Sequence, residues 1–186
     1  MKIIYGTGNA EKINQVKEFL EYKNSNIEII SLKDIKFNEH IEENGESFEE
    51  NSLIKALAIK EYCNKNNINE IIMTDDSGLC VDALGGKPGV YSARYAGENS
   101  TQLDKINKIL NEMKNVKDPN RTAKFVCVLT VIMQNNEKIV CRGETKGKIK
   151  VEPAELGKLT YGPIFIPDGF NKTLNELSPE ELRRHS

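Results

Sequence analysis

The sequence lacks the features that define several large classes of protein. It has no excess of basic charge, because 26 Lys and Arg are balanced by 28 Asp and Glu for a formal net charge of −2. Binding to nucleic acid or to a membrane surface is therefore not expected, since both depend on concentrated positive charge. No apolar run approaches the length of a transmembrane helix, and the short apolar stretch near Met1 is too short for a signal-peptide core.

Cysteine is also scarce, and none of the four cysteines forms a C-x-x-C pair. Cys80, Cys127 and Cys141 lie in apolar runs that are typical of strands. We interpret the cysteines as reduced core residues of a cytoplasmic protein rather than as a disulfide framework or a zinc site.

What the chain does contain fits one domain of 186 residues, or one domain with two lobes around a cleft. Neither repeats nor low-complexity segments interrupt it. Helical spacing predicts helices over 11–22, from 47 onward and from 100 onward, and apolar runs predict strands at 2–5, 27–30, 70–74, 79–81, 125–133, 139–142 and 148–151. Early alternation of strands and helices indicates an α/β fold, and the later strands indicate antiparallel additions to a mixed sheet.

The segment Gly6-Thr7-Gly8-Asn9-Ala10-Glu11-Lys12 lies between the first expected strand and the first expected helix. Glycines let the backbone approach a phosphate, a helix N-terminus offers unpaired N–H groups, and Lys12 adds a full positive charge. The segment is not a P-loop, and Glu11 occupies the third glycine position of a dinucleotide fingerprint. A phosphate loop and a simple strand-to-helix turn both remain open.

Asp75-Asp76-Ser77-Gly78 follows the strand expected at 70–74, at its carboxyl end. Ligands of open α/β sheets bind at that edge. Two adjacent carboxylates are costly there unless a cation stabilises them, and hard oxygen ligands near phosphates suit Mg²⁺. One of them could also accept a proton from an attacking water. The alternative is an Asx turn that ends the strand.

An acidic segment, Glu42-Glu43-Asn44-Gly45, precedes the long helix, which begins with a capping box of Ser47 and Glu50. Lys55 lies one helical turn beyond Asn51, so both can share a face. The alternatives are a solvated acidic loop and an exposed lysine. Further on, the loop at 88–95 contains two tyrosines and an arginine that either line a cleft or pack locally.

Taken in order, four strings resemble the pattern of the Ham1-type inosine/xanthosine triphosphate pyrophosphatases: TGNAEK, ENGESFEENSLIKA, TDDSGLCVDALGGKPGVYSARYAGE and RTAKFVCVL. The match runs from residue 3 to about 153. The resemblance implies a long mixed β-sheet flanked by helices, with two lobes around a nucleotide cleft, in a single domain over 1–186. It also implies Mg²⁺-dependent hydrolysis of dITP, ITP and XTP to the monophosphate and pyrophosphate, by a cytoplasmic homodimer.

The resemblance assigns roles to individual residues. Asp76 would accept a proton from the water that attacks the α-phosphorus, Lys55 would reach a phosphate oxygen, and Glu42 would hold Mg²⁺ together with Asp76. The remaining substrate contacts that it implies are Thr7, Gly8, Asn9, Ala10, Glu11, Lys12, Ser77 and Tyr161. Physical reasoning alone distinguishes neither Asp75 from Asp76 nor Glu42 from Glu43.

The chain departs from the family pattern where that family recognises the base. The usual loop reads P-R-G-x-x-G-F-G-Y-D-P, whereas residues 153–163 here read PAELGKLTYGP. Tyr161 and Pro163 remain, but Leu159 replaces an aromatic residue, Thr160 a glycine and Gly162 an aspartate.

A second departure lies near the C-terminus, where Leu182 stands in place of a lysine and the family's Ser-His-Arg motif does not occur in register. These groups would donate hydrogen bonds to the purine carbonyl edge, so their loss should weaken discrimination between bases. Three readings follow: a working purine enzyme in which Arg183, Arg184 or His185 stands in, an enzyme of pyrimidine or broader specificity, or a degenerate or truncated homologue that binds triphosphates with little hydrolysis.

Overall fold

The computed structural model describes residues 1–157 and 159–185, and the chain divides into two compact units. Unit 1 consists of Met1–Asp76 and Cys127–Arg142, and unit 2 consists of Ser77–Val126 and Gly143–Ser186. Among the described residues, no helix is long and apolar enough to cross a membrane.

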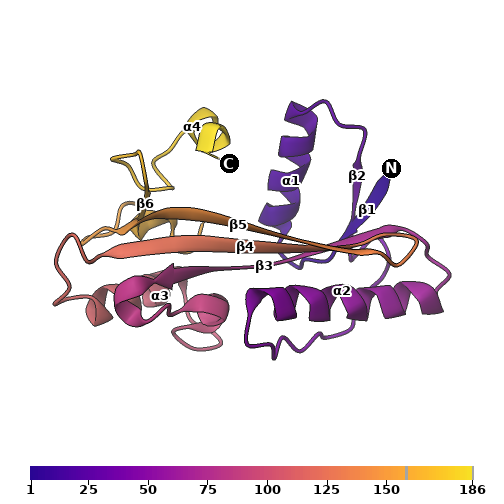
Figure 1. The fold of residues 1–186 in the computed structure, drawn as a ribbon, viewed down its shortest axis with the longest axis horizontal. Coiled ribbons are helices and arrows are strands. Elements are labelled where there is room, and N and C mark those ends of the chain that lie inside the picture. The colour runs from indigo at the N-terminus through magenta and orange to yellow at the C-terminus, as the bar shows by residue number, and fades with distance from the viewer. Residues whose placement is uncertain (158, 186) are drawn as a thin grey trace. The chain divides into compact units, whose positions relative to one another are not determined.

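The strands form one mixed sheet with the order β2-β1-β3-β4-β5-β6, drawn in Figure 1. Strand β1 pairs in parallel with both β2 and β3, whereas β5 and β6 are antiparallel. This confirms the predicted mixed α/β sheet. The strands are β1 (Lys2–Tyr5), β2 (Glu28–Ser31), β3 (Ile71–Val81), β4 (Thr122–Ile132), β5 (Lys138–Ile149) and β6 (Phe165–Pro167).

The α-helices begin at residues whose side chains satisfy the first free N–H groups. Asn9 accepts from the N–H of Glu11, Ser47 from that of Glu50, and Thr101 forms a capping box with Asp104. The helices are α1 (Ala10–Tyr22), α2 (Phe48–Lys65), α3 (Gln102–Glu112) and α4 (Pro179–His185). Short 3₁₀ turns are η1 (Asp82–Leu84), η2 (Gly89–Arg94) and η3 (Gly162–Ile164).

The core of unit 1 lies between α2 and the strands β1, β3 and β4. Its fully buried members include Ala56 and Ile59 from α2 and Ile4, Ile72 and Ile132 from those strands. Burial of each isoleucine side chain contributes about 1.5–3 kcal/mol. This packing fixes α2, which carries Lys55, against the strand that carries Asp76.

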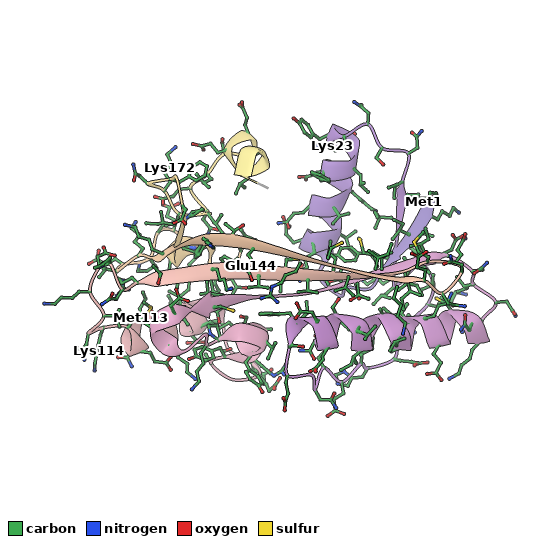
Figure 2. The ribbon with its side chains drawn as sticks, viewed as in Figure 1. Met1, Lys23, Met113, Lys114, Glu144 and Lys172 are labelled. Carbon is green, nitrogen blue, oxygen red and sulfur yellow. The ribbon has the colours of Figure 1, made fainter. Side chains whose placement is uncertain are left out.

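The core of unit 2 forms where α3 meets β3, β5 and the segment around β6. Ile106, Leu79 and Ile149 are buried there, and Phe125 and Phe165 contact edge to face with ring centroids 4.8 Å apart. At the end of α3 the backbone turns: Met113 is buried in this core, whereas the next residue, Lys114, is exposed (Figure 2).

Several predictions of strand boundaries and burial are wrong. β3 does not end at residue 74 but continues to Val81, so Asp75 and Asp76 lie inside a strand and not in an Asx turn. The expected strand at 139–142 and the first two residues of the one expected at 148–151 belong to a single strand, β5, which ends at Ile149. In both places strand pairing prevails over the local turn preference of Asp, Ser and Gly.

The cysteines are free, but their predicted burial is correct only in part. Cys63 is fully buried and Cys80 partly so, whereas Cys127 and Cys141 are exposed. Side chains alternate between the two faces of a strand. On β4 this leaves Val126 and Val128 buried and Cys127 between them exposed, so the expectation of a fully buried strand at 125–133 is also wrong.

Candidate active site

The segment after β1 begins at Gly6, which is buried and closely packed. The N–H of Gly6 donates to the carbonyl of Met73 on β3 at 2.7 Å. A Cβ atom on Gly6 would lie 2.3 Å from Ile59 Cδ1 and 2.6 Å from Thr74 Cγ2, so a larger residue would force these side chains on α2 and β3 to shift. The backbone of the turn is therefore held directly against both elements.

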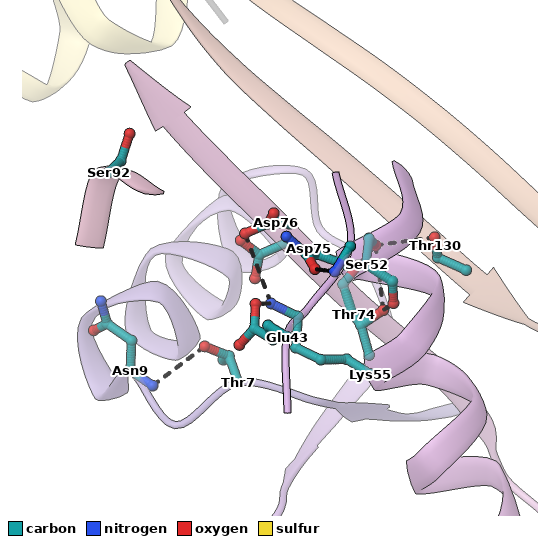
Figure 3. Close-up of polar contacts among 12 residues, drawn as sticks. Thr7, Asn9, Glu43, Ser52, Lys55, Thr74, Asp75, Asp76, Ser92 and Thr130 are labelled. Carbon is teal, nitrogen blue, oxygen red and sulfur yellow. Dashed lines mark hydrogen bonds and ion pairs between the residues drawn. The ribbon is translucent and has the colours of Figure 1, made fainter. Parts of the chain in front are cut away.

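Beyond Gly6, the turn leads into the exposed N-terminus of α1. Thr7 Oγ1 accepts from the N–H of Asn9 at 3.2 Å, and Asn9 Oδ1 accepts from the N–H of Glu11 at 2.9 Å (Figure 3). Gly8, Asn9 and Ala10 are exposed. A helix N-terminus of this kind provides N–H groups and a partial positive charge for an anion.

Asp75 is engaged by two side chains from the same unit. Lys12 Nζ on α1 forms an ion pair and hydrogen bond with Asp75 Oδ2, and the Tyr5 hydroxyl donates to Asp75 Oδ1 at 2.7 Å. Burial, together with the neighbouring Asp75 carboxylate, raises the pKa of Tyr5 well above its ordinary value. Asp75, which is only 3% exposed, thus holds Lys12 and Tyr5 in place.

Asp76 faces a different lysine. Lys55 Nζ lies 2.7 Å from Glu43 Oε2 and 3.8 Å from Asp76 Oδ1 (Figure 3). The side chains of Lys55 and Asp76 are each only 13% exposed. Charges this poorly solvated are stable only with partners of opposite sign. The acidic segment, α2 and β3 therefore meet at one ammonium group.

The loop that carries Glu43 is fixed to α2 by a buried amide. The N–H of Gly45 donates to Asn51 Oδ1 at 2.8 Å, and Asn51 is 1% exposed. A Cβ atom on Gly45 would lie 2.7 Å from Glu50 Cβ and 2.8 Å from Asn51 Oδ1. This close approach sets where the acidic loop enters the helix.

The structure distinguishes between the neighbouring acidic residues of each pair, Asp75 and Asp76 or Glu42 and Glu43, which physical reasoning from the sequence could not. Lys55 and Asp76, two of the candidate site residues, lie close together, and the glutamate beside them is Glu43, while Glu42 is exposed. Because successive strand residues point to opposite faces, Asp75 and Asp76 meet different lysines. Strand alternation would have indicated this split if β3 had been predicted to continue past residue 74.

The predicted contacts Ser77 and Tyr161 belong to unit 2. Tyr161 is 2% exposed, and its hydroxyl donates to the carbonyl of Ser92 at 2.9 Å, so this side chain packs in the core of that unit. Burial raises the pKa of Tyr161. Its predicted contact with substrate stays a prediction, as does that of Ser77.

The altered loop at 153–163 has a local packing reason for one of its substitutions. A Cβ atom on Gly162 would lie 2.1 Å from Asn175 Oδ1, so the aspartate usual at this position would collide with Asn175 as it is placed here. Lys158 of the same loop lies outside the described residues. The structure also does not describe the side chains that could replace the missing base-recognition groups, those of Arg183, Arg184 and His185.

In the described ranges 1–157 and 159–185, no group of three or more His, Cys, Asp or Glu side chains could hold a metal ion unaided. The unit 1 site instead combines two lysines, three carboxylates and a helix N-terminus around the end of β1. These features define an α/β protein with a site suited to a phosphorylated ligand.

The comparisons with known proteins identify the family. The chain belongs to the Ham1 family, whose model matches residues 3–186. It is 41% identical to the dITP/XTP pyrophosphatase of Clostridium perfringens, over 97% of this chain and 88% of that protein. It is likewise 41% identical to the dITP/XTP pyrophosphatase of Bacillus subtilis, over 98% of this chain and 89% of the relative.

Solved structures agree with this assignment. The Staphylococcus aureus Ham1 protein superimposes with a TM-score of 0.83 at 34% identity, covering 100% of this chain and 93% of that one. A HAM1 protein from Coxiella burnetii gives a TM-score of 0.82 at 31% identity, covering 100% and 91%. The family resemblance inferred from the sequence is confirmed.

Proposed function

We propose that this chain is a nucleoside triphosphate pyrophosphatase that hydrolyses dITP, ITP and XTP to the monophosphate and pyrophosphate, and so removes non-canonical purines from the nucleotide pool. The observation that supports this most strongly is the position of Lys55, whose ammonium group lies between the carboxylates of Glu43 and Asp76. Relatives about 40% identical over nearly the whole chain carry the name dITP/XTP pyrophosphatase.

In this proposal the phosphates bind at the positive end of α1. In the turn from Thr7 to Ala10, the exposed residues Gly8 and Ala10 offer backbone N–H groups, and Lys12 adds a charge at the first turn of the helix. Asp75 orients Lys12 and does not itself touch the substrate. Lys55 stabilises the negative charge that develops on the phosphate oxygens in the transition state.

Asp76 is proposed as the group that accepts a proton from the attacking water. It is little exposed and its Oδ1 lies 3.8 Å from the Lys55 ammonium group. A carboxylate within reach of a bound water can accept the proton of that water. Attack at the α-phosphorus releases pyrophosphate and leaves the nucleoside monophosphate, so one water molecule is consumed for each anhydride bond cleaved.

The same residues fit a magnesium ion. Glu43 and Asp76 already flank one cation, the Lys55 ammonium group, and Mg²⁺ typically takes one or two carboxylates and completes its shell with phosphates and water. A bound Mg²⁺ would neutralise triphosphate charge. We propose Glu43 and Asp76 as its ligands; Glu42, the residue first predicted, is exposed and one position away.

The altered loop at 153–163 supports a second candidate, a homologue that binds triphosphates with changed base preference or little hydrolysis. Gly162, packed against Asn175, cannot supply the acceptor that an aspartate would bring. Loss of a hydrogen-bonding group that recognises the base can change discrimination by several orders of magnitude. The proposed phosphate contacts belong to unit 1 and include none of these substitutions.

Pyrophosphate release measured with Mg²⁺ from ITP, dITP, XTP, ATP, GTP and dUTP separates these candidates. Release selective for ITP, dITP and XTP, and abolished by Asp76→Asn, is the expected result. Comparable release from all six would support an enzyme of broad specificity, and no release together with a nucleotide-induced rise in melting temperature would support the binding homologue.

We also propose a homodimer and a cytoplasmic location, both of which rest on the resemblance to the family. Phe19 and Tyr22 on α1 are 48% and 59% exposed, which is compatible with a surface that a second chain covers. Light scattering of the purified chain measures the mass directly, and a monomer at micromolar concentration would contradict the dimer.

A further inference from the structure

Three hydroxyl groups form a closed network in the interior of unit 1. Ser52 on α2, Thr74 on β3 and Thr130 on β4 are each 0% exposed. Ser52 Oγ donates to Thr130 Oγ1 at 2.9 Å, and Thr74 Oγ1 donates to the carbonyl of Ser52 at 2.7 Å (Figure 3). Ser52 Oγ also lies 3.3 Å from both the hydroxyl and the carbonyl of Thr74.

This network selects one alignment of a helix and two strands. A buried hydroxyl without a partner costs about 1–3 kcal/mol, so any sliding of α2 along β3 would break several bonds at once. Apolar packing tolerates small shifts, because dispersion contacts have no preferred direction. Polar contacts between Ser52, Thr74 and Thr130 therefore specify the alignment more sharply than the apolar packing does.

The network lies directly beside the proposed catalytic pair. Ser52 and Lys55 are three residues apart on α2 and so share a face of the helix. Thr74 and Asp76 are two residues apart on β3 and so share a face of the strand. The bonds between Ser52 and Thr74 thus determine how Lys55 stands against Asp76.

Thr74 has a second contact through its methyl group. The Cα of Gly6 packs so closely on this strand that an added Cβ would lie 2.6 Å from Thr74 Cγ2. The side chain of Thr74 therefore contacts α2 with its hydroxyl group and supports the turn that begins at Gly6 with its methyl group. The two contacts serve different parts of the proposed reaction.

We propose that Thr74 is a positioning residue, with its hydroxyl aligning Lys55 against Asp76 and its methyl supporting the phosphate-binding turn from Gly6 to Asn9. Ser52 is its partner on α2. This inference rests on the proposed function, because it concerns the geometry of the same site. Neither Thr74 nor Ser52 touches the reacting atoms.

Two nearly isosteric variants separate the two contacts of Thr74. Thr74→Val keeps the methyl facing Gly6 and replaces the hydroxyl, so kcat for dITP should fall about tenfold to a hundredfold with KM nearly unchanged. Thr74→Ser keeps the hydroxyl and removes the methyl, so KM should rise severalfold with kcat close to that of the wild type. Ser52→Ala should reproduce the effect of Thr74→Val.

The matched control is Ile72→Val, which deletes one methylene from a fully buried residue on the same face of β3 but touches no polar partner. It should lower the melting temperature and leave kcat and KM unchanged. The inference is overturned if Thr74→Val lowers the melting temperature but, like Ile72→Val, retains wild-type kcat, or if Thr74→Ser lowers kcat as much as Thr74→Val does.

Failure of this inference is distinguishable from failure of the proposed function. If the wild-type chain releases no pyrophosphate from any of the six triphosphates, the function itself is wrong. If the wild type is active and Asp76→Asn is not, the function stands, and the kinetic split between the two Thr74 variants alone decides whether Thr74 positions the site.

Discussion

The two units of the molecule use their buried polar groups in different ways. In unit 1, several buried side chains bond to one another across elements, as Tyr5 does with Asp75 and Ser52 with Thr130. In unit 2, two buried side chains bond to the backbone: Arg121, 3% exposed, donates to four carbonyl groups, and Ser92 joins the amide of Leu79 to the carbonyl of Gly89.

This difference indicates what each set of interactions is for. Bonds between side chains hold reactive groups at fixed separations, which a catalytic site requires. Bonds from side chains to carbonyls fix the course of the chain. In unit 2 the Arg121 guanidinium joins the end of α3 to the end of β5, just before the altered loop at 153–163.

Replacement of the proposed base in unit 1 should have the largest effect. Asp76→Asn keeps the size of the side chain but removes its ability to accept a proton, so kcat for dITP should fall by about 10²–10⁴. Steady-state pyrophosphate release measures this. Asp34→Asn, on the surface of the same unit, serves as the control and should leave kcat unchanged. Full activity of Asp76→Asn would remove Asp76 from the mechanism.

Two adjacent glutamates provide a matched test of the metal site. Glu43→Gln removes the carboxylate that lies beside Lys55, so the Mg²⁺ concentration needed for half-maximal activity should rise at least tenfold, roughly the loss caused by weakened ligand support at metal sites. Glu42→Gln, an exposed neighbour, should titrate with Mg²⁺ like the wild type. The reverse pattern would restore Glu42, the residue first predicted, as the ligand.

The corresponding change in unit 2 should affect stability rather than chemistry. Arg121→Gln leaves buried carbonyls of α3 and β5 without donors and should lower the free energy of unfolding by roughly 3 kcal/mol. Denaturant unfolding measures this loss, while kcat at a temperature where the variant is folded should stay within about twofold of the wild type. A large loss of kcat in a fully folded Arg121→Gln would contradict the assignment of catalysis to unit 1 and of a structural role to Arg121.

The smallest expected effect is a loss of stability in alkali that both units share. Burial raises the pKa of Tyr5 in unit 1 and of Tyr161 in unit 2. A phenol whose pKa is raised in the folded state contributes its full stabilisation below its unfolded pKa of about 10 and loses it as the pH rises beyond that value. The melting temperature should therefore fall above about pH 10.

Tyr5→Phe and Tyr161→Phe should each flatten this alkaline decline. Tyr5→Phe should flatten it more, because the Asp75 carboxylate adds to burial in opposing ionisation of Tyr5. Melting curves recorded from pH 8 to 11 provide the comparison. An unchanged profile in both variants would show that neither phenol governs alkaline unfolding.

The sequence alone determined the family, the α/β class and the choice of Lys55 and Asp76 as candidate site residues. It could do so because the phosphate turn, the acidic segment and the Asp75-Asp76 pair are short contiguous motifs whose order along the chain is specific. The helix starts at Asn9, Ser47 and Thr101 were also close to prediction, since capping depends on residues only two or three positions apart.

Which aspartate forms an ion pair with which lysine depends on the fold and cannot be predicted from the local sequence. Asp75 meets Lys12 and Asp76 meets Lys55 because β3 continues through both residues and places them on opposite faces. That continuation depends on pairing with neighbouring strands rather than on the local preference of Asp, Ser and Gly for turns. Other contacts of the site also join residues that are far apart in the chain, namely Glu43 with Lys55 and Thr74 with Ser52 and Gly6. Such contacts are set by packing, which no local motif encodes.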